Sequence, residues 1–95
     1  MSESRGNPRK VDTLIINDDD EAPSLLNPLT GQILLTNKVG KRIIELSDGS
    51  RDVASIGRQI SQEFRGASAS DVSQHIEKFL EAGTQKGLVT WTDQI

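Results

Sequence analysis

The stretch SLLNPLTGQILLT, residues 24–36, decides the fold. It holds two short apolar runs, residues 24–27 and 32–36, on either side of Pro28-Leu29-Thr30-Gly31. A proline presets the backbone for the first corner of a turn, and a glycine accepts a positive φ at little cost. The pattern therefore predicts an antiparallel β-hairpin.

A further strand is expected upstream of the hairpin. Residues 11–16 (VDTLII) are rich in β-branched side chains, which favour strands. Residues 17–23 (NDDDEAP) gather like charges and end in a proline, as is typical of a solvent-exposed loop. Residues 1–10 offer almost nothing to bury, so we expect a flexible N-terminal tail there. One domain is expected over residues 11–91, with a C-terminal tail over residues 92–95.

Beyond Thr36 the apolar spacing becomes helical. Asn37, Asp52 and Ser70 are the expected N-caps of three helices, since short polar side chains can accept from the first free N–H groups. The expected apolar stripes are Val39, Ile43, Ile44 and Leu46; Val53, Ile56, Ile60 and Phe64; and Val72, Ile76, Phe79 and Leu80. Gly87 ends the third helix, and the apolar segment after it is expected to be extended and to pack back on the helices. Three strands followed by three helices indicate a small α+β domain.

Composition excludes several classes of protein. A chain of 95 residues and 10.4 kDa forms one domain, and 34% hydrophobic residues allow only a small core. The absence of cysteine excludes disulfides, thiolate metal sites and cysteine nucleophiles. The N-terminus lacks the apolar region of a secretory signal, and no apolar run is long enough to span a membrane. We expect a soluble, cytoplasmic protein with no membrane partner.

The sequence holds no pattern typical of catalysis. His75 is the single histidine and lies beside Phe79 at the edge of a helical stripe, where a half-exposed polar residue that can touch a bound partner is expected. The acidic run starting at Asp18 has Pro23 at the sixth position, where a calcium loop needs glycine. The glycines form neither GxGxxG nor a P-loop. We therefore expect no catalytic residue, no metal and no cofactor.

Charge weighs against nucleic acid as a partner. The chain carries a formal net charge of -3, and the third helix has more acidic than basic residues, so phosphate would repel it. The basic side chains that could bind phosphate instead are Lys38, Lys41 and Arg42 on the first helix and Arg5, Arg9 and Lys10 in the tail. A winged-helix DNA-binding or transcription accessory protein that uses them is the alternative hypothesis.

Three contiguous apolar residues, Ile33, Leu34 and Leu35, depart from the alternation of a half-buried strand. We expect Ile33 and Leu35 in the core. Leu34 either rests under the N-terminal tail or belongs to an open edge, where unpaired N–H and C=O groups can accept an incoming strand. Apolar side chains of such a guest would enter a groove between this strand and the third helix.

The order of these motifs resembles the coenzyme PQQ synthesis protein D family, whose members are also called RiPP precursor peptide recognition elements. The resemblance extends from about Val11 to Val89. Its residues are Leu25-Leu26-Asn27, residues 29–37 (LTGQILLTN), Gly40, Ile43, Leu46, Asp48-Gly49, Val53, Ile56, Phe64, Asp71-Val72, Phe79-Leu80 and Gly87-Leu88.

The resemblance implies a fold, a role and a site. The fold would be α+β, a three-stranded antiparallel β-sheet followed by a three-helix winged helix-turn-helix bundle. The role would be that of a non-catalytic chaperone, monomeric or weakly dimeric, that binds the leader of a precursor peptide as an added strand and presents it to a modifying enzyme, such as a radical SAM protein. The expected peptide-binding residues are Gln32, Ile33, Leu34, Leu35, Thr36, His75, Ile76, Phe79 and Leu80.

Two features depart from the family pattern. Gly83 stands where a large apolar residue is usual near the end of the third helix, and a helical glycine costs about 0.5–1 kcal/mol relative to alanine. We expect a frayed last turn there. The acidic residues 18–21 exceed the usual charge and favour a basic leader by electrostatic steering.

Overall fold

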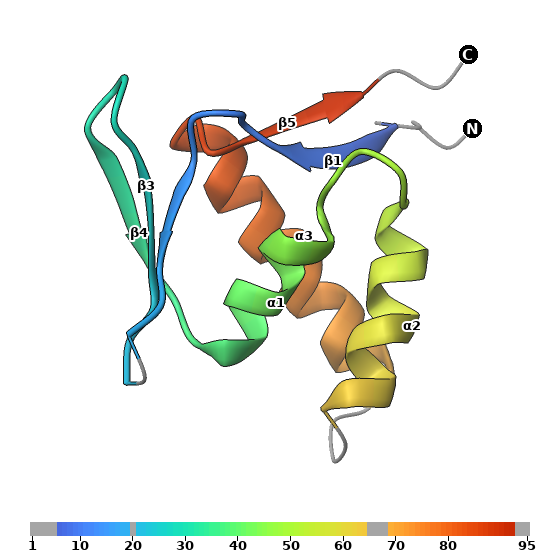
Figure 1. Cartoon of the computed structure of the whole chain (residues 1–95). Helices are drawn as coiled ribbons and strands as arrows, with labels where there is room; N and C mark the ends of the chain where they lie inside the picture. The colour runs from blue at the N-terminus through green and yellow to red at the C-terminus, as the bar shows by residue number, and fades with distance from the viewer. Residues whose placement is uncertain (1–5, 20, 65–68, 93–95) are drawn as a thin grey trace.

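The computed structural model describes residues 6–19, 21–64 and 69–92. The fold is α+β, as expected, with strands before and after three helices. In chain order the elements are β1 (Asn7–Lys10), β2 (Ile15–Asn17), β3 (Ser24–Asn27), β4 (Gln32–Leu35), α1 (Lys38–Leu46), α2 (Val53–Glu63), α3 (Ala69–Gln85) and β5 (Val89–Thr92). The strands form two separate antiparallel sheets, which lie on two sides of the helices (Figure 1).

The predicted hairpin is the centre of the larger sheet. Its strand order is β2-β3-β4, which leaves β4 at one edge. Gly31 takes a φ of +77° in the turn, and its N–H donates to the Asn27 carbonyl at 2.8 Å. A side chain at this φ would be strained, so the glycine sets the tight turn that aligns β3 with β4.

Local caps start the first two helices as predicted. Asn37 Oδ1 accepts from the Gly40 N–H at 2.9 Å at the start of α1, and Asp52 Oδ1 accepts from the Ser55 N–H at 2.8 Å at the start of α2. The third helix begins at Ala69, before the expected cap Ser70. Its end follows the prediction, because Gly87 has a φ of +73° and so reverses the chain in a conformation that other residues rarely adopt.

The second sheet corrects the expectation for the N-terminal tail. Residues 7–10 form β1, which pairs with β5 in the register Asn7↔Thr92 to Lys10↔Val89. The strand expected over residues 11–16 begins only at Ile15, since Leu14 N–H donates to the Val11 carbonyl in a turn. The cause is non-local: β5 supplies the hydrogen bonds that a polar segment lacks by itself. Residues 1–5 and 93–95 of the two expected tails lie outside the described residues.

The core lies between the sheets and the helices. Its buried members are Leu25, Ile43, Ile44, Leu46, Ile56, Ile60, Val72, Ile76, Leu80, Leu88 and Val89. The expectation that Ile33 and Leu35 belong to it is wrong, because their exposed fractions are 51% and 69%. Leu34 is the residue of β4 that packs against the core. Strand alternation is the reason, since Leu34 lies opposite fully buried Leu25 and its two neighbours must face the other way.

Gly83 also differs from expectation. The helix continues past it to Gln85, and the glycine is buried rather than frayed. A Cβ at this position would lie 2.9 Å from Val89 Cγ2, so the side chain of β5 occupies the space that a larger residue would fill. The Leu88 N–H donates to the Gly83 carbonyl at 2.8 Å, which anchors the turn into β5. In the described part of the chain, none of the helices has the length and hydropathy needed to cross a membrane.

Candidate functional site

The outer edge of β4 carries backbone groups that the sheet does not use. The register pairs Leu25 with Leu34, and Thr36 N–H donates to the Pro23 carbonyl at 2.9 Å. Hydrogen-bonded pairs alternate along an antiparallel ladder, so the N–H and C=O groups of Leu34 point to β3 and those of Ile33 and Leu35 point away. Within residues 6–19, 21–64 and 69–92, β4 has β3 as its single strand neighbour. Ile33 and Leu35 therefore offer a free pairing edge.

A close contact of three elements joins the end of β4 to α3. Gly40 of α1 is buried, and a Cβ built on it would overlap Thr36 Oγ1 and lie 3.0 Å from Phe79 Cε1. Only glycine lets the strand end and the aromatic ring approach α1 this closely. Phe79 is half-buried and packs against the core. Its ring therefore lies beside the end of the open strand.

Asn27 fixes the other end of the hairpin. This buried side chain donates from Nδ2 to the Gly87 carbonyl at 3.0 Å, and its Oδ1 accepts from Thr13 Oγ1 at 3.0 Å and from Leu29 N–H at 3.1 Å. The hairpin is thus bound to the C-terminal end of α3. Together with the Gly40 contact, Asn27 holds β4 at a set position relative to that helix.

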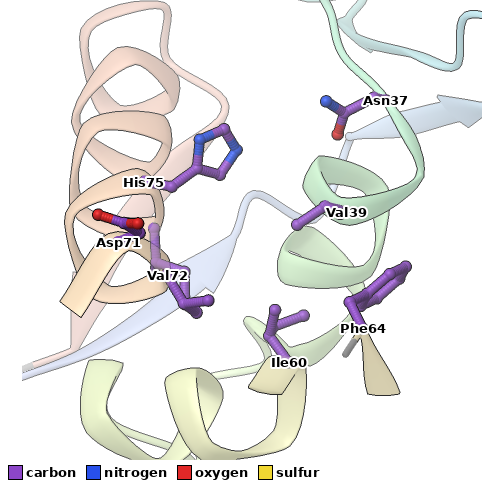
Figure 2. A pocket seen from close by; sticks show the side chains of 8 residues that line it. Asn37, Val39, Ile60, Phe64, Asp71, Val72 and His75 are labelled. Atoms are coloured by element: carbon purple, nitrogen blue, oxygen red, sulfur yellow. The ribbon is translucent and has the colours of Figure 1, made fainter. Parts of the chain in front are cut away.

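An apolar hollow of about 310 Å³ lies beyond the end of β4. Its lining residues are Asn37, Val39, Ile60, Phe64, Asp71, Val72, His75 and Ile76. Figure 2 shows α3 on one side, with His75 and Asp71, and α1 on the other, with Asn37 and Val39. Most of the wall is hydrocarbon, and the polar groups come from a few side chains. This arrangement is typical of a pocket that receives an apolar side chain and orients it by polar contacts.

The structure brings together most, not all, of the sequence-predicted site residues. His75 is exposed and lines the hollow with Ile76, whose side chain is fully buried in its wall. Leu80 is fully buried in the core, so its side chain offers no surface to a guest. The hollow also includes residues that the sequence did not single out as a site: Asn37, Val39, Ile60, Phe64, Asp71 and Val72. Phe64 had a usable signal, because it is the last member of the apolar stripe of α2 and lies at the C-cap.

Electrostatics around the site are dominated by ion pairs on α1. Asp18 Oδ2 lies 2.8 Å from Lys41 Nζ, and this hydrogen bond raises the pKa of the ammonium. Glu63 binds Arg42 through two oxygens, at 2.8 Å to Nε and 2.9 Å to Nη2, which raises the pKa of the guanidinium and lowers that of Glu63. Two basic groups of the DNA-binding hypothesis are thus bound to carboxylates.

The described side chains around the open edge and the hollow are mostly apolar, with few ionisable groups. No group of three or more His, Cys, Asp or Glu that could hold a metal occurs among them. The hollow contains one imidazole and one carboxylate, from His75 and Asp71, beside an apolar wall. A free strand edge next to an apolar hollow is the arrangement needed to hold an extended peptide.

Comparison with known proteins shows which family has this arrangement. Residues 24–89 match the family described as Coenzyme PQQ synthesis protein D (PqqD). The matched segment extends from β3 to the start of β5. The chain belongs to the PqqD family. The family consists of non-catalytic peptide-binding domains, which agrees with the expectation that the chain is not an enzyme.

Two solved structures share the PqqD-family fold. One is "TbiB1 in Complex with the TbiA(beta) Leader Peptide", with 23% sequence identity and a TM-score of 0.72, over 90% of this chain and 99% of that chain. The other is "Lasso peptide synthetase B1 complexed with the leader peptide", with 14% identity and a TM-score of 0.72, over 88% of this chain and 98% of that chain. No curated relative matches the sequence.

Proposed function

We propose that this protein is a non-catalytic chaperone that binds the leader segment of a ribosomally made precursor peptide as a strand added beside β4. The observation that carries the proposal is the outward direction of the Ile33 and Leu35 backbone groups at a sheet edge without a neighbour in the described chain. Each added backbone hydrogen bond supplies affinity without regard to sequence, and side-chain pockets supply selectivity. The two similar structures, both complexes with leader peptides, support this assignment.

The guest strand would lie between β4 and α3. Its alternate side chains would point to Phe79 and, past the strand end, into the hollow beside His75. Ile76 and Leu80 act as the rigid wall behind these contacts, since both are fully buried. Gln32 and Thr36 mark the two ends of the pairing segment.

A modifying enzyme would then act on the rest of the precursor. We assign the protein to cofactor or peptide natural-product biosynthesis in the cytoplasm, with an enzyme of the radical SAM or cyclase type as the second partner. Among the described residues, no group of three or more His, Cys, Asp or Glu could hold a metal ion for that reaction. The contribution of this protein is to hold the leader and so raise the local concentration of the core segment at the enzyme.

The mode of binding can be tested with a proline at the edge. Leu35→Pro removes an N–H that faces outward, so the β3–β4 ladder keeps its hydrogen bonds. Leu35→Thr changes the same side chain but keeps the N–H. We expect the proline variant to bind the precursor encoded beside the gene at least about tenfold more weakly than the wild type. The reason is that the variant loses one hydrogen bond to the guest strand and its ring obstructs the strand sterically. The threonine variant should lose much less affinity.

Amide shifts locate the contact. In a titration of ¹⁵N-labelled protein with the same precursor, residues 32–36 and the exposed face of α3 should shift first. As a fold control, Leu34→Pro removes an inward N–H and should lower the melting temperature, whereas Leu35→Pro should keep it near that of the wild type. Equal affinities of Leu35→Pro and Leu35→Thr would contradict strand addition. No shift with the wild type at millimolar peptide would contradict binding of that precursor altogether.

A further inference from the structure

The edge strand β4 carries apolar side chains on both of its faces. Leu34 packs against the core opposite fully buried Leu25, whereas Ile33 and Leu35 point the other way and have exposed fractions of 51% and 69%. Proteins usually protect an edge strand with charged side chains or proline, because an apolar edge pairs readily with other chains. The apolar side chains at this edge therefore indicate a contact that another molecule completes.

The sheet itself gives these two exposed side chains little apolar cover. Ile33 lies directly opposite Leu26 of β3, so it has an apolar neighbour on one side. Leu35 lies directly opposite Ser24, which is small and polar. On the other side, β4 has no strand neighbour in the described part of the chain. A strand added at this edge would supply the missing neighbours of both residues.

Strand geometry decides which guest residues those neighbours are. The N–H and C=O groups of Ile33 and Leu35 point outward, so each of them lies opposite one guest residue, with Cα atoms about 5.5 Å apart in an antiparallel pair. Directly opposite residues share a face of the sheet. The two guest residues are therefore two positions apart and lie on the face away from the core. The guest residue between them lies opposite Leu34 and faces the helices.

We propose that Ile33 and Leu35 select the leader at these two solvent-side positions, and that both positions hold β-branched, aromatic or other apolar residues. This rests on the proposed function and names the class of leader that its site takes. The guest residue between the two faces α3, whose Phe79 ring lies beside the end of β4, and is apolar for that reason. The leader segment thus carries three apolar residues in a row, as β4 does. It differs from an ordinary half-buried strand, in which every second residue is polar.

The absence of charge on the neighbouring strands makes the two positions selective. Neither β3 (SLLN) nor β4 (QILL) has a charged side chain. A charged guest residue opposite Ile33 or Leu35 would lose part of its hydration and find no opposite charge on these strands. An apolar cross-strand pair, in contrast, strengthens binding by up to about fivefold relative to alanine.

A charge-swap experiment tests the pairing. Leu35→Lys and Ile33→Lys place an ammonium group at each position and keep the backbone N–H. Leu29→Lys is the matched control, since Leu29 is 78% exposed but lies in the hairpin turn rather than at the β4 edge. The probes are the precursor encoded beside the gene and a set of its variants in which each apolar leader residue is replaced by glutamate. Isothermal titration calorimetry measures each affinity.

We expect Leu35→Lys and Ile33→Lys to bind the unmodified precursor at least about fivefold more weakly than the wild-type protein does, whereas Leu29→Lys binds it equally well. One glutamate variant of the precursor should bind the wild-type protein weakly and regain at least about fivefold with Leu35→Lys, because the two charges then form a cross-strand pair. Ile33→Lys should restore a second glutamate variant, two positions away from the first. The melting temperature should stay near that of the wild type, since both side chains are exposed.

The glutamate set gives a second measurement that needs no protein variant. On the wild-type protein, the positions that tolerate glutamate least should form a run of three consecutive residues. Loss of affinity at alternate residues only would overturn the proposal, because it would mean that the solvent-side positions are not read. Full affinity of both lysine variants for the unmodified precursor, no restored glutamate variant, or restored positions that are not two apart would overturn it as well.

Failure of the proposed function gives a different result. The wild-type protein would then not bind the precursor at all, or Leu35→Pro and Leu35→Thr would bind it equally well, and the selection proposal falls with it. Binding that is weakened by Leu35→Pro, but shows neither the run of three nor the charge-swap rescue, overturns the selection proposal alone.

Discussion

Replacing Gly40 by alanine should displace the end of β4 from α3. Alanine in a helix is favoured over glycine by about 1 kcal/mol, so the substitution alone would stabilise α1. The new Cβ, however, would overlap Thr36 Oγ1 and lie 3.1 Å from Thr36 Cβ and 3.0 Å from Phe79 Cε1. Overpacking costs about 1–3 kcal/mol, and the direct overlap with Thr36 Oγ1 puts this substitution in the upper part of that range, at about 2–3 kcal/mol. We expect a net loss of about 1–2 kcal/mol in the free energy of unfolding.

A double-mutant cycle separates the two effects. Thr36→Ala removes the hydroxyl that Gly40→Ala would strike, and the remaining contacts require shifts of only a few tenths of an ångström. In that background Gly40→Ala should cost less than about 0.5 kcal/mol, because helix propensity then offsets the residual crowding. Urea denaturation followed by the fluorescence of Trp91, the single tryptophan, measures each free energy.

The cycle can refute the packing argument directly. If Gly40→Ala is as stable as the wild type or more stable, the glycine is not needed for the close approach of β4 and α3. An equal penalty with and without Thr36→Ala would mean that the cost comes from elsewhere. Affinity for the precursor should follow the same order as stability, with Gly40→Ala weakest and the double variant partly restored, because both depend on the position of β4.

Two further predictions concern residues outside the peptide edge. Asn27→Ala should lower the free energy of unfolding by about 2–3 kcal/mol, since three hydrogen bonds to a buried side chain are lost at about 1 kcal/mol each; a change in melting temperature below about 5 °C would contradict the anchoring of the hairpin to α3. Asp48 accepts hydrogen bonds from the Ser50 side chain and backbone, which lower its pKa to about 2 from the model-compound value of 3.8. A carboxyl group whose pKa is lower in the folded than in the unfolded chain stabilises the fold at pH values above its unfolded pKa. The contribution of Asp48 should therefore disappear as the pH falls from about 4 to about 2. Because the Asp48 side chain is 43% exposed, Asp48→Asn should lower the free energy of unfolding by less than about 1 kcal/mol at pH 7. The difference in stability between this variant and the wild type should vanish near pH 2. A difference that persists at pH 2 would contradict the lowered pKa of Asp48.

The parts of the fold that follow from neighbouring residues could be predicted from the sequence. The turn at Gly31, the caps Asn37 and Asp52, and the end of α3 at Gly87 all depend on contacts within a few positions. The pairing of β1 with β5 could not be found in this way, because its partners are about 80 positions apart and residues 7–10 have no apolar pattern that would indicate a strand.

The sequence could not show which side chains of β4 are buried, for a related reason. Three apolar residues in a row indicate that both faces of the strand need cover, but they do not show whether the protein itself or a partner provides it. Leu34 meets Leu25 inside the chain, whereas Ile33 and Leu35 are left exposed. For the hollow, the helical stripes supplied most of the wall, yet its position depends on the packing of α1, α2 and α3. Spacing along one helix cannot give that packing.

The pairing of Asn7 with Thr92 also decides how this module can be joined to other polypeptides. The first residue of β1 and the last residue of β5 are direct neighbours. In Figure 1 the arrow of β5 runs away from the side of the molecule that holds β3 and β4. Tags, surface linkers or a host domain attached before Asn7 or after Thr92 would leave from a single point, remote from the open strand. The same geometry makes the fold suitable for insertion into a surface loop of a larger enzyme, where both junctions need only a narrow gap.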